Sequence, residues 1–310
     1  MSNILEQYEQ QSELSSLVRL QIQNFWSADE INYANDVVYL RNLSQENITL
    51  LCDVMQFFLF SDEIISFDIS LREFSSQIVR YNVSFQEMME HTHDLSYRKQ
   101  IKTITTALPQ CAPLFDINKK HTFACFNKFL FMQRELVAIE DSLSKQFTSS
   151  LIESLFFTTC FNIIYYFKSL NLIPSIVQAN EFIAVDEALH VDLGCEILKL
   201  NNFSYQDIHC RIIDGIMDTE LEFIEKILHG NKSLTVQKFK NQCFNNLNYF
   251  IRKSKFPVEL FQEKSKYAYI LEKKFETYSF VEAGTRHTRT HFFEKKSTAY
   301  KRYLQNDIDF

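Results

Sequence analysis

The stretch MMEHTHDLSY, from Met88 to Tyr97, places an acid, two imidazoles and a phenol within eight residues. On a helix, Glu90, His93 and Tyr97 stand at positions i, i+3 and i+7, so they lie one above another on a single face. His91 points elsewhere. Three polar groups in a row are unexpected on a helix face that serves only for packing, so this stretch raises the question of a chemical role.

A second stretch, DEALH, repeats the spacing, with Glu187 followed by His190. Each of the two E-x-x-H pairs has a lone acid upstream on an apolar helical stripe, Asp62 before the first and Glu153 before the second. The Glu153 and Glu187 segments are joined by a short turn, NLIP, so they should form antiparallel helices with the two glutamates at similar depths.

Two acid-x-x-His pairs and two further acids form the ligand set of a di-metal centre in a four-helix bundle. Two divalent ions would balance the four carboxylates, which in an apolar core without metal would protonate instead. Zinc prefers more nitrogen or sulfur and calcium prefers oxygen alone, so this set favours iron or manganese. A single E-x-x-H pair is more often a surface pair or a satisfied core histidine, and the repetition is what indicates a metal site. The predicted ligands are Asp62, Glu90, His93, Glu153, Glu187 and His190.

The composition agrees with long helices. The chain of 310 residues contains only four Gly and four Pro, too few for the tight turns of a sandwich or barrel, and its 30 Phe indicate an aromatic core. We therefore predict an all-α fold, a ferritin-like di-metal carboxylate bundle over residues 1–288. Residues 289–310 are polar and charged, and we expect a flexible tail there.

Charge and cysteine usage restrict the partners and the compartment. The net charge of −7 argues against binding to nucleic acid or to an acidic membrane. The seven cysteines form no C-x-x-C pair and indicate reduced thiols in the cytoplasm. The apolar run from Leu151 to Phe167 has 17 residues, near the lower limit for a membrane span. It contains Glu153, which is costly in lipid, so it predicts a buried central helix.

Local signals predict several helix boundaries. The sequence SADE, Ser27 to Glu30, has the form of a capping box and should start a helix. A second helix should begin near Ser44, and a break should fall near Ser75 and Ser76.

Beyond these patterns, six segments that occur in order resemble the small, radical-generating subunit of class I ribonucleotide reductase. The tail ending NDIDF resembles the acidic, Phe-terminated tail by which that subunit docks on its large subunit. The six segments are FWSADEI from Phe25, FSDEI with Asp62, MMEHTHDLSY, IESLFF with Glu153, LIPSIVQANEFIAVDEALHVD, and RTHFFEKKSTAY ending at Tyr300.

The resemblance implies that the six predicted ligands bind two iron ions, with manganese as the alternative. It also implies that Tyr97 is oxidised to a stable radical when the reduced metals meet oxygen. Phe157, Phe161 and Ile183 would enclose that radical, although each of them also suits ordinary core packing.

The resemblance further implies a route for the radical. Trp26 would connect through Asp186 to His93, which makes local sense because a histidine ligand usually gives its second N–H to a carboxylate. Tyr300 would carry the radical to the large subunit, and Phe310 would anchor the tail. A homodimer of the small subunit is also implied.

The sequence departs from the family pattern at several positions. Glu63 and Ser154 replace glycines, and Phe123 and Phe126 stand in place of tryptophans. Val185 replaces an arginine, which puts any proton-path role of that arginine in question.

The function predicted is therefore that of a ribonucleoside-diphosphate reductase small subunit, with ribose reduction on a separate chain. Four glycines cannot build a nucleotide-binding loop here. One alternative is a ferritin-like di-iron oxidase or oxygenase acting on its own substrate, which predicts an accessible cavity beside the metals and no need for Trp26, Tyr300 or the tail. A third reading, a metal-storage or degenerate partner subunit, is disfavoured because all six ligands and Tyr97 are present.

Overall fold

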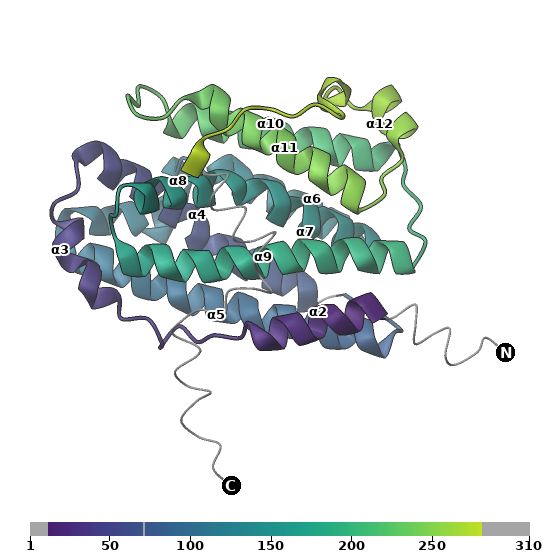
Figure 1. Cartoon of the computed structure of the whole chain (residues 1–310), viewed down its shortest axis with the longest axis horizontal. Coiled ribbons are helices and arrows are strands. Elements are labelled where there is room, and N and C mark those ends of the chain that lie inside the picture. The colour runs from purple at the N-terminus through teal and green to yellow at the C-terminus, as the bar shows by residue number, and fades with distance from the viewer. Residues whose placement is uncertain (1–11, 71, 281–310) are drawn as a thin grey trace, which may run out of the picture.

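The computed structural model describes residues 12–70 and 72–280, and over these residues it contains helices and turns but no β-strand (Figure 1). The all-α prediction is confirmed for this part of the chain, whereas the predicted boundary at residue 288 lies outside it. The elements are α2 (Ser12–Gln23), η1 (Tyr33–Asp36), α3 (Val37–Leu40), α4 (Gln45–Ser70), α5 (Gln77–Ala107), η2 (Pro109–Phe115), η3 (Ile117–Thr122), α6 (Phe126–Ala138), α7 (Ser142–Phe156), α8 (Thr158–Ser169), α9 (Pro174–Leu200), α10 (Asp207–Ile227), α11 (Val236–Lys253), α12 (Val258–Lys264) and η4 (Ala268–Ile270).

Four helices form the centre of the bundle. Helix α4 packs along α5, α7 packs along α9, and α5 also contacts α9. Helix α2 lies against α5 and α9, while α10 and α11 cover α7 from the other side (Figure 1). The central four are therefore shielded by other helices, which places their facing side chains in the interior.

Helix α4 illustrates how the sequence produces these elements. Its buried residues Leu51, Val54, Met55 and Phe58 follow the i, i+3, i+4, i+7 spacing of one helical face. Asp62 comes one turn after Phe58 and continues the same stripe into the core. The stripe thus carries a carboxylate to the middle of the bundle.

The predicted boundaries around α4 are confirmed. The Ser44 hydroxyl accepts the N–H of Asn47 just before the helix, as an N-cap does. Helix α4 ends at Ser70, and Ser76 is the residue that precedes α5.

The prediction that a helix starts at SADE is wrong. The Ser27 N–H donates to the Glu30 carboxylate at 2.9 Å, as in a capping box, but the chain forms only a turn there. The next helical turn, η1, begins at Tyr33, with Asn32 as its cap. Trp26 is buried beside this turn, so tertiary packing rather than the local signal directs the chain.

The apolar run predicted to be a central helix is indeed buried. Within residues 12–70 and 72–280, one segment, Ser142–Ser169, is long and apolar enough to cross a membrane, and its most apolar window is 94% buried inside the protein. The structure adds a feature that the sequence did not predict, because this segment divides into α7 and α8 at Phe157.

The turn between α8 and α9 makes the predicted antiparallel hairpin. Ile173 adopts a left-handed backbone conformation with φ of 43°, and Pro174 occupies the first position of α9. The Asp36 carboxylate accepts the N–H groups of Ser175 and Ile176 at 2.9 and 2.7 Å. These bonds fix the start of α9 and hence the depth at which its later residues meet α7.

Candidate metal centre

The bundle brings all six predicted ligands together. They form two groups of four buried residues, and in each group the potential ligand atoms lie within 4.8 Å of one another. Helices α4, α5, α7 and α9 contribute Asp62, Glu90 with His93, Glu153, and Glu187 with His190, in that order.

Glu90 and Glu187 belong to both groups. The first group adds Asp62 and His93, and the second adds Glu153 and His190. The His93 Nδ1 atom lies 3.1 Å from Glu187 Oε1, and His190 Nδ1 lies 3.0 Å from Glu90 Oε1. This arrangement suits two neighbouring ions. Each ion would have one acid and one imidazole of its own, and Glu90 and Glu187 could serve both ions.

The same atoms lack other partners. Within the described residues, nine buried polar atoms of the site form no hydrogen bond, although a folded protein pairs nearly all such atoms. Two cations would satisfy the carboxylate oxygens and one ring nitrogen of each histidine, and four carboxylates with two imidazoles suit iron or manganese. The atoms are Asp62 Oδ2, both carboxylate oxygens of Glu90 and of Glu187, Glu153 Oε2, His93 Nδ1, and His190 Nδ1 and Nε2.

Burial and mutual repulsion determine the protonation of the metal-free site. Burial raises the pKa of Asp62 to about 8, and the charges of Glu90 and Glu187 act in the same direction. Burial also raises the pKa of Glu153 well above its usual range. For Glu90, burial opposes ionisation, but the His190 imidazole lowers its pKa to about 2. The site without metal therefore holds protons that a cation would displace.

This protonation predicts an unusual pH dependence of stability. Between pH 6 and 8 the unfolded chain has lost its carboxyl protons while folded Asp62 and Glu153 still hold theirs, so raising the pH weakens the metal-free fold. Burial disfavours the charged form of His190, but Glu90 and Glu187 raise its pKa well above the usual value. His190 therefore also holds a proton that the unfolded chain loses, and it too makes the metal-free fold weaker as the pH rises.

We expect the melting temperature of the metal-free protein to fall between pH 6 and pH 8. The free energy of unfolding should decrease by about 1.4 kcal/mol per pH unit for each proton that the folded state retains. With saturating Mn²⁺ the decline should disappear, because the bound carboxylates are ionised throughout. Anaerobic differential scanning calorimetry at both pH values tests this. A metal-free melting temperature that rises or stays constant would contradict the described electrostatics.

Two further side chains orient the candidate ligands. The Gln86 amide donates to Glu153 Oε1 at 2.8 Å, and the Ser61 hydroxyl donates to Asp62 Oδ1 at 2.8 Å. Each bond leaves the other carboxylate oxygen directed at the site. Sequence reasoning missed both residues, although Gln86 stands four residues before Glu90 on the same helical face and that spacing could have revealed it.

Trp26, Asp186 and His93 form the predicted chain of contacts. The Trp26 indole N–H donates to Asp186 Oδ2 at 2.8 Å, and the same oxygen lies 3.1 Å from His93 Nε2. When Asp186 accepts a hydrogen bond from Nε2–H of His93, the other ring nitrogen, Nδ1, is free to act as a ligand atom facing the carboxylates.

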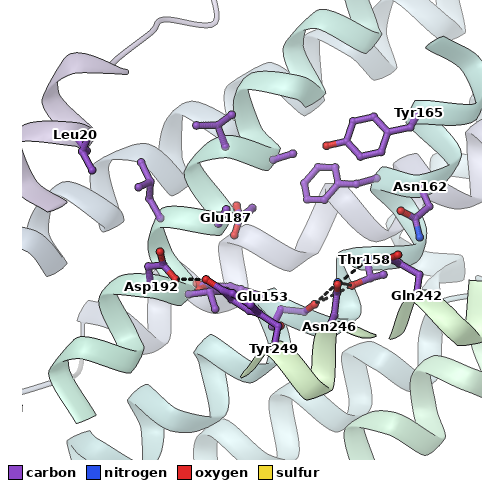
Figure 2. Close-up of a pocket in the computed structure, with 17 residues that line it drawn as sticks. Leu20, Glu153, Thr158, Asn162, Tyr165, Glu187, Asp192, Gln242, Asn246 and Tyr249 are labelled. Atoms are coloured by element: carbon purple, nitrogen blue, oxygen red, sulfur yellow. Dashed lines mark hydrogen bonds between the residues drawn. The ribbon is translucent and has the colours of Figure 1, made fainter. Parts of the chain in front are cut away.

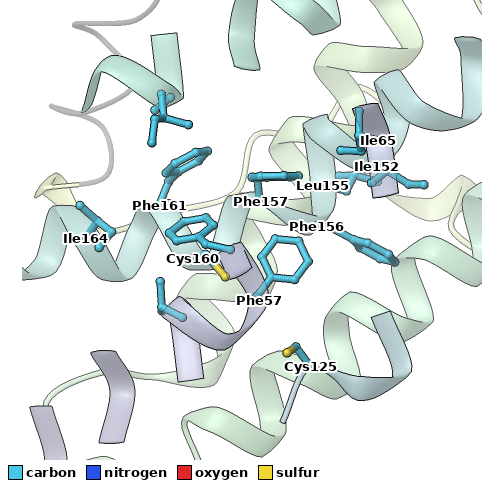
Figure 3. Close-up of a cluster of buried hydrophobic side chains, with 14 of the residues drawn as sticks. Phe57, Ile65, Cys125, Ile152, Leu155, Phe156, Phe157, Cys160, Phe161 and Ile164 are labelled. Carbon is cyan, nitrogen blue, oxygen red and sulfur yellow. The ribbon is translucent and has the colours of Figure 1, made fainter. Parts of the chain in front are cut away.

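Tyr97 is fully buried next to the site. Within the described residues its hydroxyl has no hydrogen-bond partner, and its ring stacks on Phe58 with centroids 4.5 Å apart. The ring centroids of Phe157 and Phe161 lie 6.1 and 5.4 Å from that of Phe58, and both residues belong to a larger cluster of buried hydrophobic side chains (Figure 3). Burial, with the charges of nearby carboxylates, raises the pKa of Tyr97 well above its usual value, so the phenol stays protonated at neutral pH.

Among the other predicted residues, Ile183 is fully buried on α9, while Tyr300 and Phe310 lie outside the described residues. Phe58 lies in the apolar stripe of its helix, and its contact with Tyr97 was not predicted from the sequence. That contact depends on how α4 packs against α5.

A cavity of about 340 Å³ reaches the site from the side of α7, α9 and α11 (Figure 2). Glu153 and Glu187 line it, as do Ser154 and Val185, two of the positions that depart from the family pattern. The oxidase alternative predicted such a cavity beside the metals, so this observation counts in favour of that alternative.

Comparison with known proteins identifies the family. The profile described as "Ribonucleotide reductase, small chain" matches residues 8–281. The ribonucleoside-diphosphate reductase small chain of African swine fever virus is 24% identical over 291 residues, covering 91% of this chain and 86% of the viral one. Subunit M2 of the zebrafish Danio rerio enzyme is 26% identical, covering 90% of this chain and 70% of that subunit.

Solved structures agree on the fold. A dimanganese(II)-NrdF of Streptococcus sanguinis superposes with a TM-score of 0.68 at 16% identity, covering 92% of this chain and 96% of that one. The Rnr4 homodimer of Saccharomyces cerevisiae gives 0.67 at 14%, covering 89% and 87%. The predicted ferritin-like fold class is thereby confirmed. With a family profile that spans most of its length and a buried site for two metals at its centre, this chain belongs to the ribonucleotide reductase small-chain family.

Proposed function

We propose that this chain generates a radical on Tyr97 and lends it to a separate large subunit that reduces ribonucleoside diphosphates. The observation that carries the proposal is the position of Tyr97, one helical turn after candidate ligand His93, fully buried and free of hydrogen bonds within the described residues. A phenoxyl radical persists longest where water cannot reach it, and Phe58 stacks directly on the buried Tyr97 ring.

The six candidate ligands would hold two iron ions, with manganese as the alternative, since both metals accept this donor set. When bound and reduced, the metals would supply the oxidising power by reaction with oxygen. Asp186 keeps the His93 ring in the orientation that directs Nδ1 at the site. Gln86 does the same for Glu153.

Formation of a neutral radical requires Tyr97 to lose one electron and one proton. Because burial raises the pKa of Tyr97, the proton does not leave in advance, and the two losses are coupled. Phe58, stacked on the ring, and Phe157 behind it shield the product from water, while Phe161 packs on Phe58 and also lines the cavity.

The buried contacts of Trp26 support a path for the radical out of the bundle. Trp26 is 2% exposed and connects through Asp186 to His93. We propose that this path continues to Tyr300 and that the tail ending at Phe310 docks on the large subunit. A homodimer and a cytoplasmic location complete the proposal, and the seven cysteines, all of which are free thiols, agree with the latter.

One observation favours a second candidate, an oxidase acting on its own substrate: the cavity beside Glu153 and Glu187. Such an enzyme has no use for a buried Trp26–Asp186–His93 connection. Together with membership of the reductase family, that connection favours the radical subunit over the oxidase, and over a metal-storage protein.

Electron paramagnetic resonance after addition of Fe²⁺ and oxygen tests the proposal. We expect a tyrosyl signal in the full chain, and turnover of ribonucleoside diphosphates when the large subunit is added. A chain lacking residues 307–310 should keep the signal and lose turnover. A fully iron-loaded protein without the signal would favour the oxidase, and a truncated chain that still supports turnover would disprove docking through the tail.

A further inference from the structure

The apolar segment Ser142–Ser169 is interrupted at Phe157, and neither Gly nor Pro stands there to explain it. Helix α7 ends at Phe156 and α8 begins at Thr158. The N–H of Phe157 points to the Leu155 carbonyl rather than to the carbonyl four residues back. Sharp irregularities in helices have identifiable causes, and the local sequence, IESLFFTTCF, contains no helix breaker. Phe157 keeps right-handed helical dihedrals, with φ of −80° and ψ of −20°, so the interruption is local, and a contact from another element can account for it.

A buried lysine makes that contact. Lys128 on α6 is 0% exposed, and its ammonium donates to the Phe156 carbonyl at 2.6 Å. The ammonium also lies over the rings of Phe223 and Phe57, 3.8 and 4.3 Å from their centroids. A charge so deeply buried needs a counter-charge, and Glu220 Oε2 lies 2.6 Å away.

Glu220, the counter-charge of Lys128, binds the chain on the other side of Phe157. Glu220 on α10 is also 0% exposed, and it accepts a hydrogen bond from the hydroxyl of Thr159, in the first turn of α8. From α11, the Asn246 amide donates to the Thr158 hydroxyl at 2.7 Å and to the Ser154 carbonyl at 3.2 Å (Figure 2). Side chains from three helices thus bind polar groups on both sides of Phe157.

The break separates two groups with different roles. Glu153, a candidate metal ligand, lies in the last turn before it, and Phe161, which packs on Phe58, lies in the first turn after it. Each residue of a regular helix turns the chain by about 100°. The altered hydrogen bond at Phe157 lies between Glu153 and Phe161, where a small change in the helical turn would change the angle between them. The Phe57 ring beneath Lys128 also contacts Phe157, with centroids 5.0 Å apart.

We propose that the buried Lys128–Glu220 ion pair is a positioning device that holds the step between α7 and α8, so that Glu153 faces the metals while Phe157 and Phe161 enclose Tyr97. The inference rests on the proposed function for the role of Tyr97, but its metal-binding part does not need the radical. Stability alone is a weak reason for this pair, because apolar residues of similar volume often replace a buried ion pair without loss.

The double variant Lys128→Met/Glu220→Gln tests the device. It removes both charges together and keeps the side-chain volumes, so neither partner is left as an unpaired buried charge, as it would be in a single variant. The Gln carbonyl can still accept from Thr159, but the Phe156 carbonyl loses its charged donor. We expect the variant to fold and to bind Mn²⁺ roughly tenfold more weakly, an effect of the size seen when a residue that positions a metal ligand is removed. The tyrosyl radical should also have a shorter half-life than in the wild type.

Tyr205→Phe is the matched control, because the Tyr205 hydroxyl donates to the Ser254 carbonyl at the end of α11 at 2.7 Å, away from the site. This variant should lose stability but keep the Mn²⁺ affinity and the radical half-life of the wild type. A folded double variant with wild-type values of both would overturn the inference. If the wild type forms no radical and the double variant still binds Mn²⁺ more weakly, the radical proposal fails and the positioning role of the ion pair stands.

Discussion

Replacing Tyr97 by Phe is expected to abolish the tyrosyl signal and to lower ribonucleotide reduction by on the order of 10³-fold or more, equivalent to about 4 kcal/mol in the activation barrier. The reason is chemical, since phenylalanine has no O–H bond to give up. Because the Tyr97 hydroxyl lacks a partner within the described residues, its removal leaves no other group unsatisfied. Metal content and melting temperature should therefore stay close to those of the wild type.

Tyr33 provides the matched control, because it is also buried but its hydroxyl is bonded to Ser96, the neighbour of Tyr97, at 2.7 Å. Tyr33→Phe should lose about 1–2 kcal/mol of stability and retain the radical. Paramagnetic resonance, turnover with the large subunit and thermal melting distinguish the two variants. A persistent tyrosyl signal in Tyr97→Phe would assign the radical to another tyrosine.

The second large effect concerns the two shared carboxylates. Glu187→Ala removes a residue common to both ligand groups, so neither group remains complete. We expect Glu187→Ala to lose both metal ions, with affinities reduced more than the 10–100-fold typical of outer-sphere partners.

Glu153→Ala is the matched substitution, because Glu153 belongs to one group only and the group of Asp62, Glu90, His93 and Glu187 stays intact. This variant should retain one ion per chain. Anaerobic Mn²⁺ titration followed by metal analysis gives both stoichiometries. Equal losses in the two variants, or two ions still bound by Glu187→Ala, would refute the assignment of shared and unshared ligands.

Much of the site follows from sequence spacing. Glu90, His93 and Tyr97 share a face because 3.6 residues per turn bring positions i, i+3 and i+7 into line, whatever the rest of the chain does. Glu187 and His190 follow the same rule. Few Gly and Pro, a stripe of large apolar residues and buried acids on that stripe were enough to predict a helical di-metal bundle.

Local signals failed where tertiary contacts were stronger. The capping box at Ser27 forms its hydrogen bond to Glu30, yet no helix follows, because the chain turns beside buried Trp26. The break at Phe157 has no local signal at all, because Lys128, distant in the sequence, binds the Phe156 carbonyl.

The sequence by itself determined which side chains share a helical face, and hence the ligand types, their number and the tyrosine beside them. Only the tertiary structure decided that Glu90 and Glu187 belong to both groups of potential ligands, that Phe58 covers Tyr97 and that α7 ends before α8. The physical reason is the range of the forces. The hydrogen bonds of a helix join residues four apart, whereas the depth and rotation at which two helices meet depend on packing between segments remote in the chain.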